Sequence, residues 1–130
     1  MQEEKTLQKK ILKALGSRTD TRVFQNDVGM GYHGTLNLVS GLKVLTNPTP
    51  FRYGLQVGVS DIIGLRKTLI TPEMIGREIA VFLALEVKTA SGKASPEQEN
   101  FIAMVKHFGG IADFVRSVEE AEETISWTIS

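Results

Sequence analysis

The spacing of apolar residues predicts a helix near the start of the chain. Over residues 3–15, apolar side chains recur at the spacing of one helical face, at Leu7, Ile11, Leu12 and Leu15. Gly16 follows at the position where a C-cap glycine is expected. We therefore predict an amphipathic helix from Glu3 to Leu15.

The next segment predicts short strands separated by glycine and proline. Arg22–Asn26 has the composition of a strand, whereas the glycines of Gly29–Gly34 predict a loop. A strand is predicted over Gly41–Leu45. The two prolines of Asn47–Pro50 predict a break, because each removes a backbone donor and restricts the residue before it. The apolar, β-branched segment Gln56–Leu65 predicts the next strand.

The second half of the chain predicts a strand–helix–strand unit. A turn or short helix is expected at residues 71–73, followed by an apolar central strand over Ile79–Lys88. Ser95 as N-cap, Pro96 at the first helical position and Gln98 three residues after the cap predict a helix start. That helix buries an apolar stripe and ends at the glycines at positions 109 and 110.

A strand over Ile111–Arg116 and a final helix from the N-cap Ser117 to Ile125 complete the pattern. Because a helix joins the strands at 79–88 and 111–116, we expect these strands to be parallel, with a right-handed crossover. The fold class is therefore α/β: a mixed central sheet flanked by helices.

Composition indicates one domain over residues 1–130. The chain is 42% hydrophobic and 23% charged, which suits a compact domain with its own core. The absence of cysteine excludes disulfides and thiol chemistry. With no signal-peptide pattern and no apolar run of membrane-spanning length, the expected location is the cytoplasm of a bacterium or a phage-infected host, away from membranes.

Charge is unevenly distributed along the sequence, although the formal net charge is zero. Residues 1–70 contain 10 Lys and Arg against 5 Asp and Glu, and residues 71–130 contain 5 against 10. A basic half suits a phosphate backbone. Solvated faces whose charges average out in the folded protein are an equally good interpretation.

Candidate chemistry gathers around the predicted central strand. Glu86 and Lys88 are two residues apart, so in a strand their side chains lie on the same side. If the strand carrying Asp61 is its neighbour, Asp61 joins this pair at one sheet edge. Two carboxylates and a backbone carbonyl, such as that of Val87, form a hard oxygen site for Mg²⁺ or Mn²⁺. Such a cation stabilises charge on a phosphoryl oxygen and activates water, while Lys88 positions that water or neutralises the phosphate.

These residues resemble the motifs of the virus-type replication-repair nuclease (VRR-NUC) domain, in the PD-(D/E)XK nuclease superfamily. The segments that carry the resemblance are Glu4–Ile11, Arg22–Gly29, Gly58–Ile63, Glu86–Thr89 and Gly92–Gln98. One departure is Ser60, where the superfamily name has proline before the acid. The resemblance covers nearly the whole chain and is closest to stand-alone phage and bacterial members.

The resemblance implies metal-dependent hydrolysis of DNA phosphodiesters by a restriction-endonuclease-like αβββαβ core with an added C-terminal helix. It implies metal ligation by Asp61 and Glu86, catalytic assistance by Lys88 and an active-site role for Gln98. Glu4 is implied as an acid that the first helix contributes near the metal. Because stand-alone members resemble Holliday junction resolvases, a homodimer acting on branched DNA is also implied.

Several of these residues have an ordinary structural interpretation. Gln98 fits equally well as an N3 cap, and Glu4 fits as an acid favoured by the helix dipole. Arg22 is interpreted as a phosphate contact or as the start of an exposed strand, and Lys93 as a phosphate contact in the turn. His33 is expected to be a surface histidine rather than a phosphate contact or a base.

Trp127 is expected to pack in the core or in a dimer interface rather than to stack on a base. Two other functions compete with a structure-selective endonuclease. One is a restriction-type enzyme that cuts duplex DNA at a sequence, for which 130 residues leave little room. The other is a DNA-binding module without catalysis, which the presence of every expected acid and of the lysine argues against.

Overall fold

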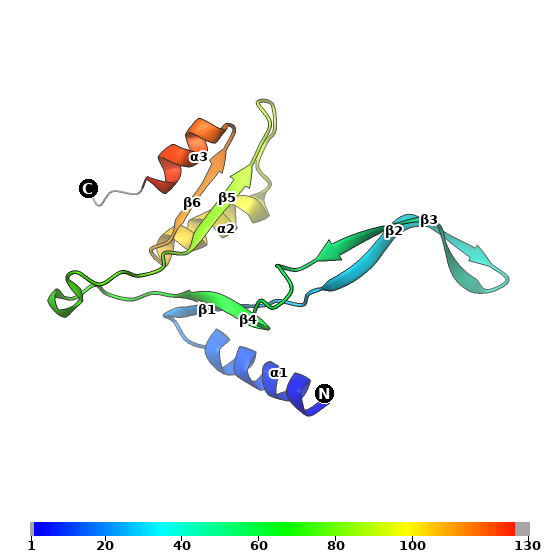
Figure 1. The fold of residues 1–130 in the computed structure, drawn as a ribbon, viewed down its shortest axis with the longest axis horizontal. Coiled ribbons are helices and arrows are strands. Elements are labelled where there is room, and N and C mark those ends of the chain that lie inside the picture. Colours follow the sequence, from blue (N-terminus) through cyan, green and yellow to red (C-terminus); the bar gives the residue numbers. More distant parts are fainter. Residues whose placement is uncertain (1, 127–130) are drawn as a thin grey trace. The chain divides into compact units, whose positions relative to one another are not determined.

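A computed structural model describes residues 2–126, and the chain divides into two compact units, Met1–Gly64 and Leu65–Ser130 (Figure 1). Trp127 and its predicted packing lie outside the described residues. Among residues 2–126, no helix combines the length and the apolar character needed to cross a membrane.

The first unit begins with helix α1 (Gln2–Gly16), which confirms the predicted helix and extends it by one residue at each end. Strand β1 (Thr21–Gln25) follows, one residue earlier than predicted, and α1 packs on it. Leu7 and Ile11 on the apolar stripe of α1 are 56% and 38% exposed. The helical period was therefore sufficient to place α1, although its stripe is only partly covered.

Strands β2 (Gly29–Val39) and β3 (Leu42–Tyr53) form a long antiparallel hairpin (Figure 1). Ser40 and Gly41 connect the strands with φ angles of 50° and 80°, the left-handed conformations that favoured two-residue hairpin turns require. The loop predicted over residues 29–34 and the break predicted over residues 47–50 are therefore wrong.

Cross-strand packing explains why the glycine-rich segment is a strand. A Cβ atom at Gly31 would lie 2.7 Å from the ring of Phe51, so glycine leaves the space that this ring fills. Asn47 has a φ of 51° beside a register irregularity opposite His33 and Thr35. Both strands of a two-stranded sheet are edges, where proline is tolerated, so β3 accommodates its prolines.

Strand β4 (Ile62–Arg66) pairs with β1 and is shorter than the predicted strand over residues 56–65. A turn precedes it, because Val59 N donates to Gln56 O at 3.1 Å and Gly58 has a φ of 89°. Asp61 consequently lies immediately before β4, not within a strand as the prediction for residues 56–65 implied.

The second unit is a strand–helix–strand unit followed by a helix. Strands β5 (Leu83–Val87) and β6 (Ile111–Val115) are parallel, and helix α2 (Pro96–His107) connects them. The parallel pairing and the start of α2 are confirmed. The central strand is shorter than predicted, because residues 79–82 precede β5 without strand structure.

The core of the second unit lies between α2 and the two strands. Val105 is fully buried, and Ile102 and Ala112 pack with it at 7% and 3% exposure. A 3-10 helix, η1 (Pro72–Met74), occupies the predicted turn, and helix α3 (Val118–Ile125) confirms the predicted final helix.

The α/β class is confirmed, and the strands of residues 2–126 pair as three two-stranded sheets, β1–β4, β2–β3 and β5–β6. The expected neighbour relation between the strands carrying Asp61 and Glu86 is not among these pairings. Asp61 belongs to the first unit and Glu86 to the second.

Candidate active site

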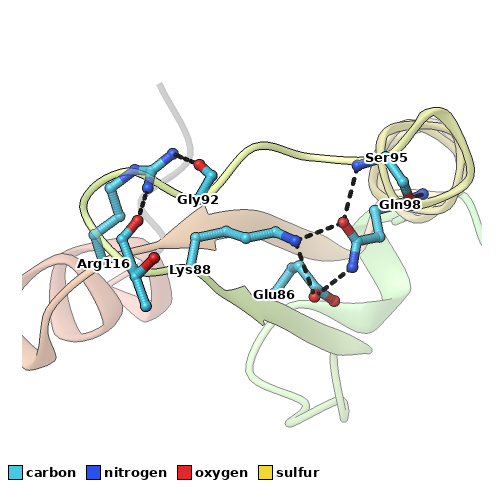
Figure 2. A network of polar contacts seen from close by, with 7 residues as sticks. Glu86, Lys88, Gly92, Ser95, Gln98 and Arg116 are labelled. Carbon is cyan, nitrogen blue, oxygen red and sulfur yellow. Dashed lines mark hydrogen bonds and ion pairs between the residues drawn. The ribbon is translucent and has the colours of Figure 1, made fainter.

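The carboxyl end of β5 brings a carboxylate and an ammonium group together. Glu86 is the penultimate residue of β5, and Lys88 N donates to Val115 O at 3.0 Å, which extends the parallel ladder by one residue. The side chains of Glu86 and Lys88 therefore lie on the same side of the strand, and Lys88 Nζ is 3.8 Å from Glu86 Oε1 (Figure 2). The predicted adjacency of this pair is present in the structure.

The start of α2 supplies the third member of the site. Ser95 Oγ accepts from Gln98 N at 3.1 Å, and Ser95 N donates to Gln98 Oε1 at 3.0 Å. These reciprocal bonds form a capping box, with Pro96 at the first helical position. The sequence pattern at residues 95–98 therefore predicted the first residue of α2 correctly.

Gln98 also binds both charged residues of β5 (Figure 2). Its Oε1 accepts from Lys88 Nζ at 2.7 Å, and its Nε2 donates to Glu86 Oε1 at 2.7 Å. Because both partners of Oε1 are donors and the partner of Nε2 is an acceptor, only one orientation of the amide satisfies all three bonds. One side chain therefore makes the capping bond to Ser95 and also contacts Lys88 and Glu86, and the active-site role of Gln98 stays a prediction.

Burial strengthens this network. The Lys88 side chain is 15% exposed and that of Glu86 is 37% exposed. A shielded ammonium group needs acceptors, and here one amide oxygen and one carboxylate surround it. The two hydrogen bonds of Gln98 and the ion pair therefore hold these three side chains together within the protein.

Asp61 and Glu4 lie in the first unit, and both line one hollow there. The other residues that line this hollow include Lys5, Gln8, Asn26, Asp27, Arg52 and Tyr53. Glu4 is in the first turn of α1, where the helix dipole favours an acid. Within this unit, Glu4 and Asp61 therefore share one hollow, and the implied role of Glu4 near a metal stays a prediction.

Asn26 fixes the segment that carries Asp61, and sequence reasoning did not single it out. Asn26 N donates to Asp61 O at 2.8 Å, and Asn26 Nδ2 donates to Ser60 O at 3.1 Å. Its Oδ1 accepts from Leu55 N at 3.1 Å, and the residue is only 8% exposed. The position of Asn26 within Arg22–Gly29, a segment that carries the family resemblance, was the available signal.

The remaining predicted residues lie at the surface. Arg22 is exposed in β1, and Lys93 is exposed between Gly92 and the N-cap Ser95. Val87 ends β5 opposite Val115 and is 75% exposed. His33 stacks on Phe51 with ring centroids 4.0 Å apart, which agrees with its interpretation as a surface histidine that packs on its neighbour.

The donors suit a hard divalent cation in kind. Glu86 and Asp61 offer carboxylate oxygens, and Val87 offers a backbone carbonyl, the ligands that Mg²⁺ and Mn²⁺ take. Both contacts of Glu86 use Oε1. Within residues 2–126, no group of three or more His, Cys, Asp or Glu side chains converges on one point.

A carboxylate, an ammonium group and an amide thus meet where β5 ends and α2 begins, in a protein of the α/β class. A family model described as the VRR-NUC domain matches residues 28–119. This match covers more than two thirds of the chain, so the chain belongs to the VRR-NUC family, a family of nucleases. No curated protein and no solved structure matches the chain.

The family match spans residues of both units, including β2, β3 and the whole segment from β5 to β6. It therefore confirms the resemblance inferred from the motifs at 58–63 and 86–98. The nuclease assignment itself follows from this membership.

Proposed function

We propose that this VRR-NUC protein is a Mg²⁺- or Mn²⁺-dependent DNA endonuclease. In this proposal residues 1–130 act as one domain, and two copies act together on branched DNA such as a Holliday junction. The observation that carries the proposal is the bridge that Gln98 makes between Glu86 and Lys88. Family membership supports the nuclease class, and the resemblance of the motifs to stand-alone members supports the metal, the substrate and the dimer.

Each residue of the network has a separate task in hydrolysis. Lys88 places a positive charge where the scissile phosphate or the attacking water lies, which favours the charge that develops in the transition state. Gln98 holds Lys88 and Glu86 in place. Water attacks phosphorus, one P–O bond breaks, and the departing oxygen takes up a proton.

In the same proposal Asp61, Glu86 and the Val87 carbonyl hold the cation, with Glu4 as a further ligand. A bound Mg²⁺ or Mn²⁺ supplies Lewis-acid stabilisation of the phosphoryl oxygens and a more acidic water. The assignment of Asp61 rests on the motif at 58–63 and on the hollow that it shares with Glu4. Arg22 and Lys93 contact phosphates of the DNA.

Cleavage assays test the mechanism. A labelled four-way junction, a flap and a linear duplex are incubated with the protein and Mg²⁺. Lys88→Ala and Asp61→Ala should each lower the cleavage rate by at least about a hundredfold, as expected for loss of a group that stabilises transition-state charge. Lys106→Ala, which removes an equivalent charge from the last turn of α2, should cut like the wild type.

Three outcomes would change the proposal. Equal activity of Lys88→Ala and wild type would remove the mechanism. Cleavage of linear duplex at one sequence, in preference to junctions, would favour the restriction-type alternative. Junction binding without cleavage under any divalent ion would favour a non-catalytic module.

Titration with Mn²⁺ tests the ligands without an activity readout. Asp61→Ala and Glu86→Ala should each weaken Mn²⁺ binding, measured by calorimetry or electron paramagnetic resonance. Glu123→Ala, an exposed acid on α3, is the matched control and should leave binding unchanged. Unchanged affinity in Glu4→Ala would remove Glu4 from the ligand set.

Light scattering of the purified protein tests the dimer, and a monomeric mass would contradict it.

A further inference from the structure

A four-residue turn connects the two halves of the candidate site. It begins at Thr89, directly after Lys88, and ends at Gly92, shortly before the N-cap Ser95. Gly92 N donates to Thr89 O at 3.0 Å and closes the turn. A Cβ atom at Gly92 would lie 3.1 Å from Thr89 Oγ1, so the turn is tight at this end. The path of this turn sets where the start of α2 lies relative to the end of β5.

Arg116, which directly follows β6, donates side-chain hydrogen bonds to this turn (Figure 2). It is the first residue after β6, next to Val115, whose carbonyl holds Lys88 N. One guanidinium nitrogen, Nη1, donates to Thr89 O, and the other, Nη2, donates to Gly92 O at 2.9 Å. The two bonds hold the first and the last carbonyl of the turn with one planar group.

Arg116 is itself anchored at its backbone. Arg116 N donates to Glu120 Oε2 at 2.6 Å, in the first turn of α3. In α3, the N3 residue Glu120 thus accepts a hydrogen bond from the backbone of Arg116 and not from that of the N-cap Ser117. The result is a continuous connection from α3 through Arg116 to the turn.

The turn matters because the hydrogen bonds of Gln98 link residues on both sides of it. Gln98 Oε1 needs donors from both sides of the turn, Lys88 Nζ before it and Ser95 N after it. If the turn relaxes, Ser95 and Lys88 no longer face the same oxygen. The three-way geometry at Gln98 therefore depends on the distance that the turn spans.

We propose that Arg116 is a positioning residue of the nuclease reaction, which acts by fixing the Thr89–Gly92 turn so that Gln98 can hold Lys88 and Glu86 together. This inference rests on the proposed nuclease function. Arginine is required, because its rigid planar fork reaches two carbonyls at once, whereas the single ammonium group of lysine has no such geometry. Arg116 is exposed, so its removal is expected to disturb the site more than the fold.

The test compares Arg116→Ala and Arg116→Lys with Arg77→Ala, an exposed arginine that loses the same charge elsewhere in the second unit. Both Arg116 variants should lower kcat on a four-way junction by about tenfold or more, the scale of effect that misplacement of reacting groups produces. KM should stay within about twofold of the wild-type value, since uniform substrate binding is retained. Arg77→Ala should match the wild type in both parameters.

Hydrogen exchange gives a second readout that needs no activity. In Arg116→Ala and Arg116→Lys, the amides of Gly92 and Ser95 should exchange faster than in the wild type, while the amide of Val105 in the core should not change. Arg116→Lys serves if Arg116→Ala does not fold. Unchanged exchange at both amides would overturn the proposal.

The kinetic outcomes are equally decisive. A raised KM with an unchanged kcat would make Arg116 a DNA contact and overturn the positioning role, as would wild-type kcat in both variants. If the wild-type protein cuts no DNA, the proposed function fails. The exchange measurement then still decides whether Arg116 fixes the turn.

Discussion

Gln98 shows how one neutral side chain can organise two charged ones. Its amide accepts from Lys88 and Ser95 through Oε1 and donates to Glu86 through Nε2. A glutamate at this position keeps the acceptors and loses the donor. It would also place two carboxylates against each other, which raises the free energy of the folded state.

At the residue scale, we therefore predict that Gln98→Glu lowers the free energy of unfolding by about 1–3 kcal/mol at neutral pH, the cost of an unsatisfied partly buried polar contact. Gln25→Glu is the matched control, because Gln25 Nε2 also donates to a carboxylate, that of Asp27, but at an exposed position. That change should cost less than about 0.5 kcal/mol. Urea unfolding of both variants measures the difference, and equal losses would contradict the prediction.

At the scale of elements, α2 and α3 begin in nearly the same way. Ser95 Oγ accepts from Gln98 N and Ser117 Oγ accepts from Glu120 N, each at 3.1 Å. The two caps differ in what the third helical residue does next. Gln98 turns toward the candidate site, whereas Glu120 accepts from Arg116 N.

This pair allows stability to be separated from function. Ser95→Ala and Ser117→Ala should each cost about 1 kcal/mol of stability, the usual value of an N-cap. Ser95→Ala should lower kcat for DNA cleavage more than Ser117→Ala, because the N3 residue of α2 contacts Lys88 directly, whereas that of α3 reaches the turn only through Arg116. Thermal unfolding and single-turnover cleavage of both variants check this, and an equal loss of kcat in both would show that the cap acts through stability alone.

For the whole molecule, the uneven charge of the sequence follows the division into two units. The first unit contains 8 Lys and Arg against 5 Asp and Glu, and the second contains 7 against 10. A basic unit attracts the DNA backbone and releases counterions when DNA binds, so affinity should fall steeply with salt.

We predict that Arg22→Ala weakens DNA binding at every sequence tested and reduces the slope of log K against log salt by about 1, the value for one phosphate contact. The slope is measured by fluorescence anisotropy of labelled DNA, with Mg²⁺ replaced by Ca²⁺, a cation chosen so that the protein binds DNA without cleaving it. Lys106→Ala, from the acidic second unit, should leave the slope unchanged. The prediction fails if both variants shift it equally.

Elements defined by local chemistry were predicted well from the sequence. The helical period placed α1, and Ser95-Pro96 with Gln98 placed the start of α2, because caps and apolar faces are encoded within a few residues. The parallel pairing of β5 and β6 followed from the helix between them.

The hairpin was not predicted, because its cause lies across the chain. Gly31 reads locally as a loop residue, and Pro48 and Pro50 read as breakers. The Gly31 position leaves space for Phe51, twenty residues later, and the prolines are tolerated on an edge strand. Such cross-strand complementarity has no signal within a short sequence window.

The sequence by itself determined the pairing of Glu86 with Lys88, the capped helix that carries Gln98, and membership of a nuclease family. These properties depend on residue type and short spacing, which a linear pattern records. Only the tertiary structure decided that Gln98 bonds three partners at once and that Arg116 holds the turn between them. Apart from the bond between Gln98 and Ser95, these contacts join residues 10 to 27 positions apart, and their geometry exists only when β5, α2 and β6 are packed together.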